Sequence, residues 1–193
     1  MALITKIVCS LAKGRSMTFA GLAFVVGASV FSGALILPVQ SAPAAEYQVK
    51  AVFLFNFAQF VEWPPSAFPQ GQTSLVIGVL GQDPFGSYLD DTVRGERVNN
   101  RPLTVRRYRR LEEIQTCHVL FISRSEAERM DQILASLKYR KILTVADAEG
   151  PAGARVMIRF VTQQNKIRLR INPEAARAAN LTISSKLLRL GGS

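Results

Sequence analysis

The adjacent residues Cys117 and His118 are the first place where this sequence offers a nucleophile beside a base, and His118 is the only histidine of the 193 residues. They begin an apolar run, CHVLFI, that is typical of a buried strand. Neighbours on a strand point to opposite faces of the sheet, so this thiol and imidazole cannot share a metal ion or act as a base–nucleophile pair. A buried strand thiol usually serves packing. We therefore predict a structural role for both.

Other catalytic patterns fail on spacing or on residue counts. The serine–lysine stretch at residues 184–186 lacks the S-x-x-K spacing of serine–lysine acylases. The glycines of LVIGVLGQDPFG, residues 75–86, do not fall in the G-x-G-x-x-G order of a dinucleotide loop. Two cysteines and one histidine exclude a zinc ribbon and a multi-histidine metal site. The sequence therefore predicts no catalytic residues, no metal and no cofactor, and a protein that is not an enzyme.

The alternating segment IRLRIN, residues 167–172, is a candidate ligand site. Alternation on a strand places Arg168, Arg170 and Asn172 on one face and three aliphatic side chains on the other. Two arginines beside an amide can hold the carboxylate or phosphate of a small anionic ligand. The alternative is that these three residues form the solvent side of an edge strand.

The elements that would position these residues alternate between short apolar runs and amphipathic segments. Asp83 is a good N-cap, and Pro84 suits the first position of the helix that would follow. The pattern predicts strands at residues 75–80, 103–107, 117–122 and 141–145, and a helix at residues 125–138. Such alternation favours one α/β domain with a mostly parallel sheet and helices on both faces.

The two ends of this domain add further elements. Residues 46–63 are apolar at nearly every position, which predicts a helix buried on more than one side and ended by Pro64 and Pro65. Residues 155–161 and 166–171 alternate and predict a C-terminal antiparallel hairpin around residues 163–165. Short helices are expected from Pro173 and at residues 184–190.

The first 44 residues predict a secretory signal. Basic residues precede an apolar run over residues 17–39, and Ala42-Pro43-Ala44 has the small-residue pattern of a signal-peptide cleavage site. We expect a signal peptide at 1–44, cleavage after Ala44, and a domain at 45–193; the alternative is an uncleaved membrane anchor. The remaining chain would carry Cys117 alone, which excludes an intramolecular disulfide. Export also removes nucleic acid as the partner of the arginine-rich stretch at residues 94–110, leaving a solvated face or attraction to an acidic partner or an anionic membrane surface.

Five blocks in this order resemble the YfiR family of exported proteins: YQVKAVFLFNFAQFVEWP, LVIGVLGQDPFG, CHVLFIS, ILTVAD and IRLRINPEAARAANLTISSKLLRL. The resemblance implies a periplasmic, often dimeric, Rossmann-like domain without enzymatic activity. It also implies binding to the periplasmic domain of an inner-membrane diguanylate cyclase, or of another membrane sensor, as a homodimer. Holding the cyclase inactive lowers cyclic di-GMP and biofilm formation. The alternative is a small-molecule sensor subunit that signals to a membrane kinase or receptor.

The resemblance also implies particular sites. A ligand site near the family's final strand matches Arg170 and Asn172 here. The family commonly carries paired cysteines, but the position that would face Cys117 is Gly78, so disulfide control is not expected. A repressor needs apolar anchors for its partner. We expect them at Val156, Ile158 and Phe160, which would share one strand face, or on the exposed side of the first helix; the alternative is that this strand face is core.

Overall fold

The computed structural model describes residues 42–69, 73–147, 150–164 and 166–191, which belong to one compact unit. The segment predicted as a signal peptide lies almost wholly outside the described residues. Within the described ranges, no helix is both long and apolar enough to cross a membrane.

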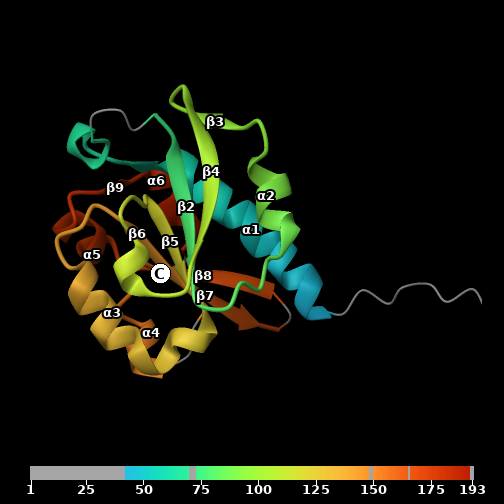
Figure 1. Cartoon of the computed structure of the whole chain (residues 1–193). Helices are drawn as coiled ribbons and strands as arrows, with labels where there is room; N and C mark the ends of the chain where they lie inside the picture. Colours follow the sequence, from blue (N-terminus) through green and yellow to red (C-terminus); the bar gives the residue numbers. More distant parts are fainter. Residues whose placement is uncertain (1–41, 70–72, 148–149, 165, 192–193) are drawn as a thin grey trace, which may run out of the picture. The chain divides into compact units, whose positions relative to one another are not determined.

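A seven-stranded sheet with the order β3-β4-β2-β5-β6-β7-β8 forms the centre of the domain (Figure 1). The five strands from β4 to β7 in this order run parallel, and β3 and β8 pair antiparallel at the two edges. A mixed α/β domain with a mostly parallel sheet is thereby confirmed. The strands are β2 (Leu75–Leu80), β3 (Arg97–Val98), β4 (Arg101–Tyr108), β5 (Val119–Ile122), β6 (Leu143–Ala146), β7 (Ile158–Gln163) and β8 (Lys166–Ile171).

Helices cover both faces of the sheet. Helices α1 and α2 pack with one face, whereas α3 packs with the other. A separate two-stranded sheet joins β1 (Val61–Glu62) to β9 (Thr182–Ile183) and connects the end of α1 to the C-terminal segment. The helices are α1 (Ala42–Phe60), α2 (Ser87–Val93), α3 (Met130–Leu137), α4 (Gly150–Gly153), α5 (Pro173–Ala178) and α6 (Ser185–Leu190), with short 3-10 turns at Pro65–Ala67, Leu111–Glu113 and Arg124–Arg129.

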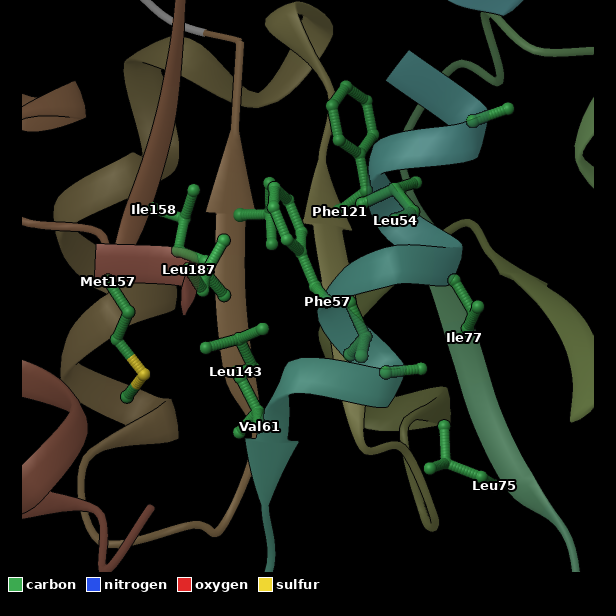
Figure 2. Packing of buried hydrophobic residues seen from close by; sticks show 14 of the residues in the cluster. Leu54, Phe57, Val61, Leu75, Ile77, Phe121, Leu143, Met157, Ile158 and Leu187 are labelled. Atoms are coloured by element: carbon green, nitrogen blue, oxygen red, sulfur yellow. The ribbon is translucent and has the colours of Figure 1, made fainter. Parts of the chain in front are cut away.

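The two hydrophobic clusters explain why the apolar runs form central strands. Leu54 and Phe57 of α1 pack in the larger cluster with Ile77 and Phe121 (Figure 2). On the other side, Met130 of α3 packs in the second cluster with strand residues such as Leu120 and Ile122. All six residues of β2 are buried, as a strand covered on both faces requires.

Two predicted helix starts were wrong. Asp83 and Pro84 do not begin a helix, because α2 begins at Ser87 after Gly86, whose φ of 56° suits glycine. Asp83 instead accepts a hydrogen bond from the Phe85 amide at 2.8 Å and pairs with Arg107 at 2.7 Å. The segment predicted as one helix from residue 125 starts as a 3-10 turn, and its α-helical part begins at Met130.

Helix α1 begins and ends earlier than predicted, and it is less buried. It ends at Phe60, because the chain then pairs as β1 with β9. Its inner side includes Ala51, Leu54 and Phe57, each with no exposed surface. Its outer side leaves Val49 and Val52 about half exposed, at 48% and 49%.

Candidate functional site

Strands β7 and β8 bring four basic side chains to one face. Arg159 lies opposite Arg170, and Gln163 lies opposite Lys166 in the antiparallel register. Directly paired residues share a face, and the alternation places Arg168 there as well. The opposite face carries Phe160 and its partner Leu169, which are buried in the core. We call Arg159, Lys166, Arg168 and Arg170 the basic face of β7–β8.

The structure brings two of the three predicted ligand residues together. Arg170 and Asn172 line a small cavity of about 120 Å³ that also contacts Arg159. The side chain of Asn172 is already engaged as the N-cap of α5, because its Oδ1 accepts a hydrogen bond from the Ala175 amide at 3.0 Å. Arg168 is exposed on β8 and is not one of the cavity-lining residues. A ligand here would find one exposed guanidinium and a partly engaged amide.

The predicted partner anchors Val156, Ile158 and Phe160 require correction. Their exposed fractions are 2%, 0% and 2%, so a partner cannot contact these side chains in this structure. They also do not share a face, since Val156 belongs to the cluster on the α3 side and the other two to the cluster on the α1 side. Phe160 stacks on Phe57 of α1, with 5.9 Å between ring centroids. Because α1 covers the strand face that carries Ile158 and Phe160, this face belongs to the hydrophobic core.

The second predicted location for partner anchors, the outer side of the first helix, does carry exposed apolar surface. Val49 and Phe53 of α1, together with Ile167 of β8, line a groove of about 610 Å³. Val52 adds further exposed apolar surface on the same helix. We call this groove and the adjoining Val52 the α1 groove; its lining residues are Ala45, Glu46, Val49, Phe53, Thr162, Lys166 and Ile167.

A buried charge network that the sequence analysis missed lies between α1 and the sheet. Lys50 has no exposed surface, and its Nζ lies 2.6 Å from Oδ2 of Asp147 and 2.5 Å from Oε1 of Glu46. The Tyr47 hydroxyl donates to the same Asp147 oxygen at 2.8 Å. Arg124 donates to the other carboxylate oxygen at 3.0 Å. Asp147 follows β6 directly, so the network ties α1 to the carboxyl end of that strand.

The titration behaviour of the network follows from these contacts. Burial by itself would raise the pKa of Asp147, but hydrogen bonds from Lys50, Tyr47 and Arg124 outweigh it and hold the pKa below the ordinary value. Burial, together with the hydrogen bond to Asp147, raises the pKa of Tyr47 well above its usual range. Asp147 is therefore ionised and Tyr47 is a neutral donor at neutral pH.

The predicted strand at residues 117–122 begins only at Val119, so Cys117 and His118 lie directly before β5, where they pack in separate surroundings. Cys117 packs in the cluster on the α3 side, where burial raises the pKa of its thiol to about 12. His118 accepts a hydrogen bond from the Val76 amide at its Nδ1, at 3.0 Å, and stacks on Phe68. A neutral buried thiol is a poor nucleophile. Among the described residues, no cluster of three or more histidine, cysteine or acidic side chains could hold a metal ion.

Comparison with known families identifies the chain. The family model described as YfiR/HmsC-like matches residues 47–192, which include every strand of the described sheet. The protein therefore belongs to the YfiR/HmsC-like family. Comparison with curated proteins finds no significant match.

Proposed function

We propose that this protein is a periplasmic regulator that binds and represses an inner-membrane diguanylate cyclase, which lowers cyclic di-GMP and biofilm formation. Membership of the YfiR/HmsC-like family is the observation that carries the proposal, because this family suggests regulators of such cyclases rather than enzymes. Within the proposal, the fold is Rossmann-like, the chain is exported with cleavage after Ala44, and it acts as a homodimer.

The α1 groove supports a role in protein contact. Exposed apolar side chains that gather beside a groove are typical of surfaces that contact another protein. Val49 and Val52 are about half exposed on one helix, next to the edge strand β8. Repression requires that the partner's inactive state be bound more tightly than its active state, and a few apolar anchors usually supply most of such binding energy.

A substitution in α1 tests the proposal in cells. Val52→Asp places a charge on exposed surface, so the protein should fold normally yet release the cyclase. Cyclic di-GMP and surface attachment should then rise as much as they do on deletion of the gene. Leu190→Asp is the matched control, since Leu190 is 58% exposed on α6 and lies outside the α1 groove. No change in cyclic di-GMP on deletion of the gene would refute the cyclase role.

The second candidate function is a small-molecule sensor subunit that signals to a membrane kinase or receptor. The cavity that contacts Arg170 and Asn172 is the observation that favours it. In this case Arg168, Arg170 and Asn172 would respond to an anionic ligand. The variant Arg170→Gln distinguishes the two functions. In a sensor it should abolish the response to the ligand. In a repressor it should leave repression of the cyclase by the unliganded protein intact.

A further inference from the structure

Another cavity, of about 250 Å³, lies beyond the carboxyl ends of the parallel strands β5 and β6, alongside β7, which extends past them. Arg124 follows β5, Asp147 follows β6, and Arg159 belongs to β7. Open α/β sheets bind ligands at the carboxyl ends of their parallel strands, because loops and backbone groups converge there. The lining residues are Arg124, Asp147, Gly150, Arg159, Phe160, Val161 and Thr162.

The carboxylate of Asp147, which lines this cavity, already has hydrogen-bond donors and cations around it. Oδ1 of Asp147 accepts from Arg124 at 3.0 Å, and Oδ2 accepts from Lys50 at 2.6 Å and from Tyr47 at 2.8 Å. Three donors, two of them cationic, leave this carboxylate little capacity for a further cation. Arg124 is fixed by the same contacts, because its Nε also donates to the Asp147 carbonyl oxygen at 3.0 Å.

Arg159, in contrast, lacks an acidic partner among the described residues. Its Nε is buried without any hydrogen-bond partner, and its Nη1 reaches only the Gly150 carbonyl oxygen, at 3.4 Å. A buried guanidinium N–H without an acceptor is unfavourable, so an anion that supplied one would bind with a gain. The cavity therefore offers one fixed arginine and one arginine in need of an acceptor.

We propose that this cavity binds a small molecule through a carboxylate or phosphate group held between Arg159 and Arg124. The planar guanidinium fork matches the paired oxygens of both groups. The volume is below that of pockets for drug-sized ligands, which limits the ligand to a small anion or metabolite. Val161, which shares the strand face of Arg159 and is partly exposed, supplies apolar wall for the remainder of such a molecule.

This site goes beyond the proposed function. It shares Arg159 with the neighbouring cavity, but Arg168, Arg170 and Asn172 do not line it. It also uses none of the exposed valines of α1. Binding here can be measured on the purified protein without any cyclase, so the failure of one proposal does not decide the other.

Titration of the purified protein with two probes tests the site directly. Inorganic phosphate and malonate are titrated by calorimetry after expression of the full sequence, with chloride at equal ionic strength as the reference anion. Phosphate or malonate, but not chloride, should release heat of binding and raise the melting temperature. In the same titration, the NMR signal of the Arg159 Nε–H should shift. The better probe distinguishes a phosphate ligand from a carboxylate ligand.

Variants then locate the bound anion. Arg159→Gln should weaken the affinity for the better probe by about tenfold or more, because it removes the charge and the fork. Arg177→Gln is the matched control, an exposed arginine of α5 that lines neither cavity, and should change the affinity by less than about twofold. Circular dichroism checks that each variant is folded.

Three results would overturn the proposal. The first is that neither probe binds better than chloride. The second is that the Arg159 Nε–H signal of the unmodified protein does not move at saturation, a measurement that holds even if Arg159→Gln fails to fold. The third is that Arg170→Gln weakens binding as much as Arg159→Gln does, which would place the anion in the neighbouring cavity.

Discussion

At the residue scale, the ion pair between Lys50 and Asp147 should be costly to break. Asp147→Ala would leave the Lys50 ammonium buried with Glu46 as its remaining acidic contact. Removing one member of a buried pair typically costs about 3–5 kcal/mol, since the other charge stays out of water. Urea denaturation should therefore show a loss of this size in the free energy of unfolding.

An exposed ion pair provides the control for this prediction. Asp91 pairs with Arg94 at 2.6 Å, but both side chains are at least half exposed. Asp91→Ala should change the free energy of unfolding by less than about 1 kcal/mol. If Asp147→Ala cost no more than Asp91→Ala, the buried pair would not be what fixes α1 to the sheet.

The buried side chain of His118 should lower the free energy of unfolding in mild acid. Burial, and to a lesser degree the charge of Arg101, lowers the pKa of His118 to about 4. The unfolded chain then takes up a proton near pH 6.5 that the folded chain refuses until about pH 4. The stability that the neutral imidazole contributes is complete above pH 6.5 and falls as the pH drops towards 4. Between pH 7.5 and 4.5 the expected loss is about 2–3 kcal/mol.

His118→Gln separates this effect from the carboxylates. A glutamine oxygen can still accept from the Val76 amide, which His118 contacts at 3.0 Å, but the side chain does not titrate. The pKa of Asp147 is lowered, so its own contribution falls in the same direction but at more acidic pH, in the variant and the unmodified protein alike. Equal pH dependence of unfolding in both proteins would contradict the assignment to His118.

At the element scale, β2 and the residues before β5 approach closely enough for a disulfide. A Cβ added to Gly78 would lie 2.8 Å from the Sγ of Cys117, near the distance that such a bond requires. We expect Gly78→Cys to oxidise to a bond with Cys117 and to be about 2–4 kcal/mol more stable oxidised than reduced. Thiol titration and unfolding with and without reductant measure this.

The same position also has a steric cost that a control must reveal. The added Cβ would lie 2.7 Å from Cε2 of Tyr108, so the ring must shift. Gly78→Ser introduces the same crowding without a bond and should destabilise by about 1–3 kcal/mol in either redox state. Free thiols in oxidised Gly78→Cys would show that the two sulfur atoms cannot meet.

Elements with a strong local signal could be predicted from sequence, whereas long-range contacts could not. The apolar run at residues 75–80 predicts a buried strand and is β2 in the structure. Both faces of β2 are covered, so none of its six positions is polar. Asp83 looked like a helix cap, but its pairing with Arg107, 24 positions away, holds it outside the helix. Alternation showed that Ile158 and Phe160 share a face, but not that α1 covers it.

The buried network left a signal that sequence reasoning can use. Lys50 is the single cation of a mostly apolar helix predicted to be buried, and such a charge needs an acidic partner. Asp147, at the end of ILTVAD, is an acid placed directly after a buried strand. What the sequence could not supply is the packing of α1 against the carboxyl end of β6, which brings these residues together.

At the scale of the whole molecule, net charge and the α1 groove should control different rate constants of partner binding. Residues 45–193 carry 21 basic and 14 acidic side chains, a net charge of +7. Part of the arginine-rich stretch is neutralised locally, as Arg94 and Arg107 pair with acids of α2. The exposed arginines of β8 add to the remaining field, which would steer an acidic partner during encounter.

We therefore expect salt to change association and the groove to change dissociation. Raising sodium chloride from about 50 mM to about 500 mM shortens the screening length several-fold and should slow association with the periplasmic domain of the proposed cyclase partner. Val52→Asp should instead speed dissociation, because it removes an apolar contact formed only in the complex. Surface plasmon resonance resolves both rate constants. If salt acted mainly on dissociation, and Val52→Asp mainly on association, charges rather than the α1 groove would hold the complex together.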